Sequence, residues 1–151
     1  MEWTKDDFSI STDKARLNVA FIHDSLSKTY WAANVPPDVV QRSIEGSLCF
    51  GIYHLNNQIG FARVITDEAT FAYLCDVFID EAYRGKGLSK WLMEMILAYP
   101  GLQGLRRFML ATRDAHELYR QYGFSELTFI DRWMHIHWPD VYKTFKPNHE
   151  N

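Results

Sequence analysis

The first third of the chain has the hydrophobic pattern of one short strand followed by two helices. The strand is predicted over residues 8–12, where apolar and small polar residues alternate. Asp13 is a suitable N-cap for the first helix. The second helix begins after Pro36-Pro37 and places Val40 and Ile44 one turn apart on its buried side.

Three strand-like runs then follow in close succession. Residues 47–55 and 58–66 flank Asn56-Asn57, which predicts a hairpin. Residues 70–79, with the sequence TFAYLCDVFI, are nearly continuously apolar. Such a run is typical of a strand inside a sheet with both faces buried.

The second half alternates between helical and strand-like patterns. The segment after Gly87 carries apolar residues at helical spacing, namely Leu88, Trp91, Leu92, Met95 and Ile96. A strand is predicted over 106–112, and Asp114 and Glu117 resemble a capping box for a short helix. Residues 125–138 predict one or two closing strands.

The order of these elements fixes the expected fold class. Reading along the chain, it is β-α-α-β-β-β-α-β-α-β. The strand–helix–strand unit over 70–112 needs a crossover, which makes one strand pair parallel in an otherwise antiparallel sheet. We therefore expect an α/β (α+β) fold with a mixed, mainly antiparallel central sheet flanked by helices. No linker or repeat divides the chain, so a single domain is predicted over 1–151.

Composition narrows the choice of partners. The 151 residues are 47% hydrophobic with a net charge of −3, which fits a folded globule without a basic field for nucleic acid. No apolar run approaches the roughly 20 residues that span a bilayer, and no signal segment begins the sequence. Cys49 and Cys75 lack metal-ligand spacing. We expect a cytoplasmic protein with no metal, nucleic-acid or membrane partner, and the sequence leaves a homodimer open.

The stretch from Tyr83 to Ser89, YRGKGLS, stands where strand 70–79 gives way to a helix. Glycines let several backbone N–H groups point at one ligand, and a helix N-terminus attracts anions. Arg84 and Lys86 add positive charge. The spacing fits neither the P-loop nor the dinucleotide fingerprint. The alternative is an ordinary glycine turn with two solvated cations.

Strand 70–79 followed by Arg84-x-x-Gly87-x-Ser89 resembles the acyl-CoA signature of the GNAT family of N-acetyltransferases, written R/Q-x-x-G-x-G/A. Ser89 departs mildly from it, since Gly or Ala is usual there. The resemblance implies a GNAT-type sheet whose parallel pair splays at the CoA site, and acetyl-CoA as acyl donor. It also implies a set of CoA-binding residues: Val77, Phe78, Ile79, Arg84, Gly85, Lys86, Gly87, Leu88 and Ser89.

The same resemblance implies roles within that set and beyond it. The turn holds the CoA pyrophosphate, while amides of residues 77–79 pair with pantetheine and polarise the thioester carbonyl. Tyr119, in ELYRQYGF, matches the family's late tyrosine near the CoA sulfur and is the expected acid. Taken alone, an aromatic residue on a helix is as readily part of the core. Tyr122 is expected to be structural.

Asp76 is the one charged residue in FAYLCDVFI, and a buried charge needs a reason. It is a candidate base or water-orienting carboxylate. The alternative is a structural ion pair with a nearby arginine such as Arg63. Alternation turns Cys75 to the opposite face, which disfavours it as a nucleophile. His135 and His137 lack a third metal ligand at recognisable spacing.

The acceptor side carries a weaker signal. In the GNAT fold the loop between the first two helices covers the amine site, and here it contains Tyr30 and Trp31. Trp133 is a candidate wall on a late strand. Aromatic faces can hold a cationic amine, although the same residues are equally suited to a core.

Together these features predict an acetyl-CoA-dependent N-acetyltransferase acting on a primary amine, favoured to be that of a small molecule, by direct attack in a ternary complex. One alternative acetylates a protein lysine or N-terminus. Another is a non-catalytic acyl-CoA-binding regulatory module.

Overall fold

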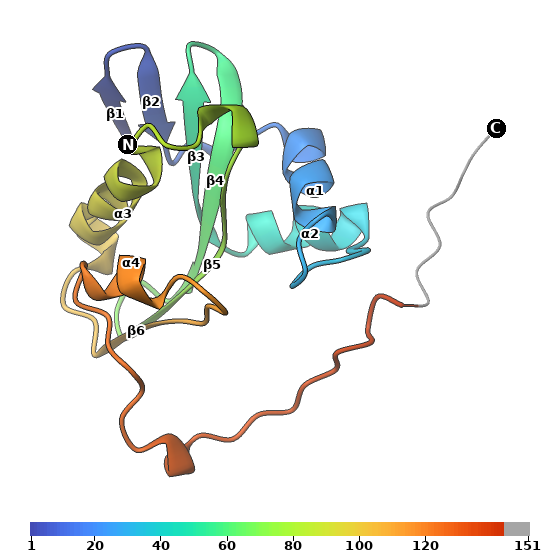
Figure 1. Cartoon of the computed structure of the whole chain (residues 1–151), viewed down its shortest axis with the longest axis vertical. Coiled ribbons are helices and arrows are strands. Elements are labelled where there is room, and N and C mark those ends of the chain that lie inside the picture. The colour runs from blue at the N-terminus through green and yellow to red at the C-terminus, as the bar shows by residue number, and fades with distance from the viewer. Residues whose placement is uncertain (144–151) are drawn as a thin grey trace.

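The computed structural model describes residues 1–143, in which six strands form one sheet in the order β1-β2-β3-β4-β5-β6 (Figure 1). All neighbouring strands are antiparallel except β5 and β6, which are parallel. The predicted mixed, mainly antiparallel sheet is therefore confirmed. The strands are β1 (Glu2–Lys5), β2 (Phe8–Ser11), β3 (Leu48–His54), β4 (Asn57–Thr66), β5 (Phe71–Ile79) and β6 (Arg107–Leu110).

Helices cover both faces of this sheet (Figure 1). One layer holds α1 (Val19–Ser27) and α2 (Pro37–Glu45), and the other holds α3 (Leu88–Ala98) and the short α4 (His116–Arg120). Alternation along β4 serves both layers. Phe61 packs in the α1/α2 cluster, whereas the next residue, Ala62, packs in the cluster that contains α3.

The first two helices begin for different reasons. Asn18 caps α1, since its Oδ1 accepts from the N–H of Phe21 at 3.0 Å. The predicted helix start at Asp13 is wrong, because Asp13 instead caps a 3₁₀ turn over Lys14–Arg16. The start of α2 at the proline pair is confirmed, with Val40 and Ile44 buried as expected.

One strand escaped the sequence analysis. β1 pairs with β2 through a tight turn in which Asp6 adopts a left-handed φ of 54°. The alternating sequence EWTK followed by an aspartate pair was the available signal, but four residues at the chain start are a weak one. No helix within residues 1–143 is long and apolar enough to cross a membrane.

The end of the described chain differs most from expectation. The closing strands predicted over 125–138 are wrong, because residues 125–143 contain only a 3₁₀ turn at Ile130–Arg132. This segment, called the arm below, runs extended away from α4 (Figure 1). Strand-like alternation is present, but a strand also needs a partner to bond with, and the described chain supplies none.

The predicted capping box of α4 is also wrong. Ala115 occupies the N-cap and makes no side-chain hydrogen bond to the helix. Thr112 takes part of that role, because its Oγ1 accepts from the N–H of Ala115 at 3.0 Å. Asp114 points instead toward Arg113, with 3.9 Å between the charged atoms.

Candidate active site

The site forms where β5 parts from β6. The parallel pairing ends at Leu74 and Leu110, so the second half of β5 keeps only β4 as a neighbour. A register shift opposite β4 and a left-handed φ of 55° at Asp76 mark a bulge that bends β5 there. Backbone groups of residues 77–79 that face away from β4 are thereby left open to a ligand.

The glycine turn follows directly from this open strand. Gly85 and Gly87 have φ values of 78° and 76°, and an added Cβ at either would meet nothing within 4 Å. Both positions therefore require glycine for backbone conformation rather than for space. Gly87 is the N-cap of α3 and offers no side chain, so the first N–H groups of that helix remain available.

A cavity of about 320 Å³ opens at this turn. Arg84, Gly85, Gly87, Leu88 and Ser89 line it, together with Ile79, Tyr83, Lys90 and Leu118. Thus six of the nine expected CoA-binding residues surround one hollow. Lys86, Val77 and Phe78 are not part of its lining.

Two side chains brace the turn. Arg84 donates from Nε to the carbonyl of Ile79 at 3.2 Å, which ties the turn to the end of β5. The Tyr83 hydroxyl and His54 Nδ1 share a hydrogen bond of 2.9 Å, which anchors the turn to β3. The Arg84 side chain therefore stabilises the turn by a hydrogen bond and also adds positive charge to it.

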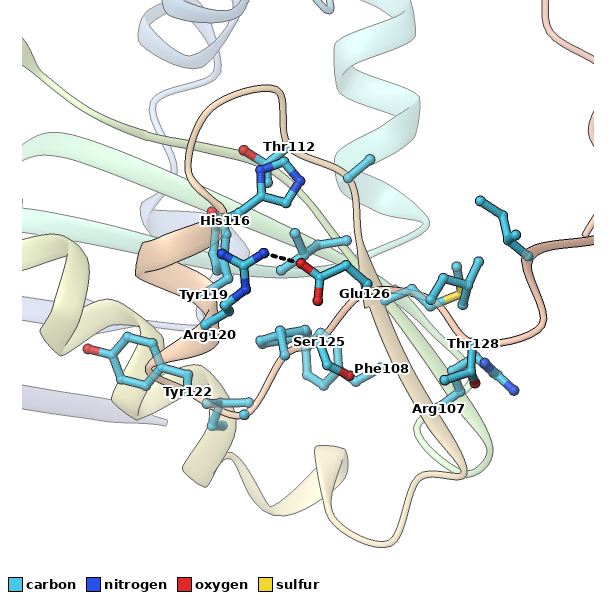
Figure 2. A pocket seen from close by; sticks show the side chains of 18 residues that line it. Arg107, Phe108, Thr112, His116, Tyr119, Arg120, Tyr122, Ser125, Glu126 and Thr128 are labelled. Atoms are coloured by element: carbon cyan, nitrogen blue, oxygen red, sulfur yellow. Dashed lines mark hydrogen bonds and ion pairs between the residues drawn. The ribbon is translucent and has the colours of Figure 1, made fainter.

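α4 brings Tyr119 to a second, larger hollow of about 680 Å³ between β6, α4 and residues 122–130 (Figure 2). Its neighbour Leu118 lines the cavity at the glycine turn, so α4 borders both hollows. Tyr119 is half-buried and packs edge-on against Phe124 with ring centroids 6.0 Å apart. Burial raises the pKa of Tyr119, which keeps its hydroxyl protonated at neutral pH.

Tyr122 lines the same hollow as Tyr119, but its hydroxyl has a backbone partner. Its hydroxyl donates to the carbonyl of Lys90 at 3.3 Å and so connects the end of α4 to α3. This contact agrees with the structural role expected for Tyr122.

Asp76 has a partner on each carboxylate oxygen. Arg63 donates from Nε to Oδ2 at 2.9 Å, and Trp31 donates from Nε1 to Oδ1 at 3.0 Å. The ion pair is largely buried, with the Arg63 and Asp76 side chains 16% and 11% exposed. Arg63 also donates to the Ser47 hydroxyl at 3.1 Å. Of the two interpretations left open by the sequence, the structure thus contains the ion pair.

The loop between α1 and α2 closes over the open end of β5. Trp31 fastens it to Asp76, and the Arg113 guanidinium lies 3.9 Å above the Tyr30 ring. Arg113 follows β6, so the loop contacts both sides of the splayed strand pair. Arg113 was not among the predicted site residues, because one exposed charge in a connecting loop has no local signal in the sequence.

Trp133 lies elsewhere. Its ring packs under the Arg107 guanidinium at 4.8 Å, and Arg107 pairs with Phe71 at the start of β5. Phe71 is five residues from Asp76, which corresponds to roughly 17 Å along a strand. The structure therefore does not bring Trp133 of this chain to Trp31.

The two cysteines and the two late histidines lie outside the lining of both hollows. Burial raises the pKa of Cys75 to about 12 and that of Cys49 to about 11, so neither is a thiolate at neutral pH. His135 and His137 lie exposed with ring centroids 5.9 Å apart. No group of three potential metal ligands occurs within residues 1–143.

Comparison with known proteins decides the family. The family model described as Acetyltransferase (GNAT) domain matches residues 45–126, which include the open strand, the glycine turn and α4. The chain belongs to the GNAT family. This membership confirms the predicted enzyme class, an acyl-CoA-dependent acetyltransferase.

Individual relatives agree with this assignment. A Gibberella zeae protein named as a candidate acetyltransferase is 34% identical, with 78% of each chain covered. The crystal structure of a candidate GNAT acetyltransferase from Xanthomonas campestris is 50% identical, with a TM-score of 0.89 over 91% of this chain and 97% of that one. An Elizabethkingia anophelis GNAT acetyltransferase with acetyl-CoA bound shares the fold at 15% identity, with a TM-score of 0.63 over 89% and 90% of the two chains.

Proposed function

We propose that this GNAT acetyltransferase transfers the acetyl group of acetyl-CoA to the primary amine of a small molecule by direct attack in a ternary complex. The observation that carries the proposal is the convergence of three features at one strand end. The open half of β5 and the glycine turn meet there, α4 reaches the hollow at the glycine turn through Leu118 and the second hollow through Tyr119, and the α1–α2 loop is hydrogen-bonded to β5 through Trp31.

Acetyl-CoA, the proposed donor, matches two features of the site, the open edge of β5 and the N-terminus of α3. The N–H groups of the glycine turn and of the first turn of α3 would hold the pyrophosphate. The pantetheine arm would then follow the open edge of residues 77–79, where a free N–H can polarise the thioester carbonyl. Bound acetyl-CoA in the Elizabethkingia relative, which shares the fold, supports this choice of donor.

The reaction removes two protons from an ammonium substrate and supplies one to the thiolate. A primary amine has a pKa around 10, so it must lose a proton before its nitrogen attacks the carbonyl carbon. The C–S bond then breaks, and Tyr119 donates its hydroxyl proton to the departing thiolate. The nitrogen loses its second proton to solvent water as the amide forms, and solvent returns a proton to Tyr119. Because both Asp76 oxygens already accept hydrogen bonds, we assign the amine proton to solvent water and assign Asp76 to positioning Trp31.

The acceptor side supports a compact substrate. The Trp31–Asp76 hydrogen bond and the Arg113–Tyr30 contact hold the α1–α2 loop at both sides of the opening. An exposed Tyr30 and a half-exposed Trp31 offer aromatic surface to a cationic amine. A peptide would need an extended groove beside this loop, and neither of the two hollows described above reaches residues of the loop.

Release of free CoA thiol tests the reaction. We expect acetyl-CoA to yield thiol in the presence of some members of a panel of small primary amines, and not with lysine peptides or peptide N-termini. Turnover with the peptides alone would instead favour a protein acetyltransferase. Binding of acetyl-CoA without thiol release across the whole panel would favour a regulatory module.

Replacing Tyr119 by phenylalanine tests the acid. Tyr119→Phe removes the donated proton without removing the ring, so kcat should fall by about 10²-fold while acetyl-CoA affinity is retained. Tyr122→Phe is the matched control, because Tyr122 lies three residues away and its hydroxyl donates to the backbone carbonyl of Lys90 in α3. Equal kcat values for Tyr119→Phe and the wild type would remove Tyr119 from the mechanism.

A further inference from the structure

Arg113 lies at the end of the sheet where the proposed reaction takes place. The paired part of β5 and β6 ends at Leu74 and Leu110. Three residues further along these two segments are Val77 and Arg113. The segments part there, and the α1–α2 loop contacts both of them. Arg113 therefore lies across the opening from the strand end that is proposed to hold the thioester.

A series of direct contacts connects Arg113 to Asp76 on β5. Asp76 accepts a hydrogen bond from Trp31 at 3.0 Å, and the Trp31 ring meets the Tyr30 ring edge-on with centroids 5.1 Å apart. The guanidinium carbon of Arg113 lies 3.9 Å from the centroid of the Tyr30 ring. Two aromatic side chains thus separate the strand from the cation, and a small molecule with a functional group at each end can span such an opening.

The charge of Arg113 is available to a ligand. Its one ion-pair partner within residues 1–143 is Asp114, and 3.9 Å between the charged atoms is too long for a hydrogen bond. The two side chains are 65% and 75% exposed, so the pair contributes little. Tyr30 attracts the cation through the face of its ring, which leaves the guanidinium N–H groups available as donors.

Arg63, the second arginine on this side of the site, has no charge to offer. It pairs with Asp76 at 2.9 Å, is largely buried and donates to the Ser47 hydroxyl as well. Of the two arginines, only Arg113 therefore presents its charge to a ligand. The planar fork of a guanidinium matches the two oxygens of a carboxylate, whose single negative charge it balances. A phosphate monoester, with a charge of about −1.5 to −2 at neutral pH, would remain partly unbalanced.

We propose that the acceptor is an amino carboxylate, whose amine attacks the thioester at the open end of β5 while its carboxylate binds Arg113. The inference rests on the proposed transfer to a small primary amine and specifies the class of that amine. Arg113 then determines specificity, because it favours a carboxylated amine over an alkylamine and repels the second ammonium group of a diamine.

Matched pairs of amines test this class. Thiol release is measured with glycine, β-alanine, γ-aminobutyrate and ε-aminocaproate, each beside the n-alkylamine in which a methyl group replaces the carboxylate. For the best acid, the wild-type kcat/KM should exceed that of its alkylamine by about 10-fold or more, because the carboxylate forms charge-assisted hydrogen bonds. In Arg113→Met, whose unbranched side chain can keep an apolar contact with Tyr30, this ratio should fall to about 1.

Arg106→Met is the matched control, because Arg106 is an exposed arginine directly before the opposite end of β6. It should keep the wild-type ratio. Alkylamines that react as fast as the acids in the wild type would overturn the inference but leave the proposed function intact, whereas thiol release with none of the amines would overturn both. A faster reaction of phosphoethanolamine than of any of the acids would contradict the assignment of a carboxylate.

Charge reversal gives a test by gain of activity, which a misfolded variant cannot produce. Arg113→Glu should lower kcat/KM for γ-aminobutyrate and raise it for putrescine, a diamine of similar length, because a carboxylate at this position attracts ammonium. An unchanged preference between these two amines in Arg113→Glu would overturn the role of Arg113.

Discussion

Among single residues, Asp76 carries the most structure in the site. Its φ of 55° is costly for a residue with a side chain, and it is stabilised by Arg63 on one oxygen and Trp31 on the other. One carboxylate thereby bends β5, neutralises a largely buried guanidinium and fixes the loop over the acceptor side.

The variant Asp76→Asn should distinguish these structural roles of Asp76 from a role in proton transfer. Loss of the carboxylate leaves Arg63 without its counter-charge, so the free energy of unfolding should fall by about 3 kcal/mol. The acceptor KM should rise more than kcat falls, because Trp31 is displaced while the donor site is intact. Chemical denaturation and steady-state kinetics measure the two effects.

Asp38→Asn provides the comparison for Asp76→Asn. Its partner is Arg42, and both side chains of this pair are 70% or more exposed, so removing it should change stability by less than about 0.5 kcal/mol. A loss of kcat with unchanged acceptor KM in Asp76→Asn would restore Asp76 as the base.

Tyr53 tests the energetic cost of burying a hydroxyl group that has no hydrogen-bond partner. Its side chain is 2% exposed, and no hydrogen-bond partner for its hydroxyl occurs within residues 1–143. Tyr53→Phe should therefore raise the free energy of unfolding by about 1 kcal/mol in urea at pH 8. A lower stability than the wild type would show that the hydroxyl is satisfied in solution.

The same substitution predicts a change with pH. Burial raises the pKa of Tyr53 to about 12 from an ordinary value near 10. Because burial disfavours the ionised form, stability is unaffected by this group below pH 10 and falls between pH 10 and 12, where the unfolded chain ionises first. Over that range the wild type should lose stability more steeply than Tyr53→Phe.

At the scale of elements, hydrophobic periodicity correctly predicted the helices and strands that pack against a neighbour in the same chain. The β3–β4 hairpin, the strand β5 and the helix α3 follow their sequence patterns because each buries its apolar residues against a neighbour in the same chain. The arm has an equally clear pattern and forms no strand. Alternation shows that a segment can bury one face as a strand. It does not identify the strand with which that segment pairs.

Helix starts were predicted less well for a related reason. Asp13 and Asp114 both have suitable cap chemistry, but Asp13 starts a 3₁₀ turn and Asp114 faces Arg113. Short polar side chains satisfy whichever backbone groups the tertiary structure leaves nearby. Asn18, which caps α1, could be distinguished from Asp13 only once the position of the helix was known.

The β4–β5 turn should respond to acid through Asp67. Its Oδ1 accepts from the N–H groups of Ala69, Thr70 and Phe71, and Oδ2 accepts from the Thr70 hydroxyl. These bonds lower the pKa of Asp67 below its usual range, so the stability that they contribute is present above about pH 4 and is lost in stronger acid.

Asp67→Ala should accordingly lower the thermal midpoint at pH 7, with a gap to the wild type that shrinks toward pH 2. Asp114→Ala, which changes an exposed aspartate outside this turn, should leave the midpoint unchanged at both pH values. A gap that stays constant with pH would contradict the role of the carboxylate.

At the scale of the whole molecule, the two sides of the site differ in how far sequence alone could predict them. The donor side is contiguous, since the strand, glycine turn and helix lie within residues 71–98, and its motif is readable. The acceptor side is assembled from the α1–α2 loop, β5 and the loop after β6. No local pattern joins Tyr30 to Arg113 or Trp31 to Asp76, so those contacts needed the fold. The single domain over residues 1–151 stays a prediction.

The glycine turn is the proposed holder of the CoA pyrophosphate. Calorimetric titration of Gly87→Val with CoA tests this role directly. Valine is strained at the φ of 76° found there, which distorts the N–H groups that face the ligand. Gly104→Val is the matched control, because Gly104 has a φ of 74° and equally open surroundings in a different loop. Pantetheine, which lacks the pyrophosphate, serves as the control ligand.

We expect Gly87→Val to bind CoA at least ~10-fold more weakly than the wild type, which corresponds to about 1.4 kcal/mol. Gly104→Val should bind CoA as the wild type does, and all three proteins should bind pantetheine equally. Wild-type CoA affinity in folded Gly87→Val would contradict the assignment of this turn as the donor site.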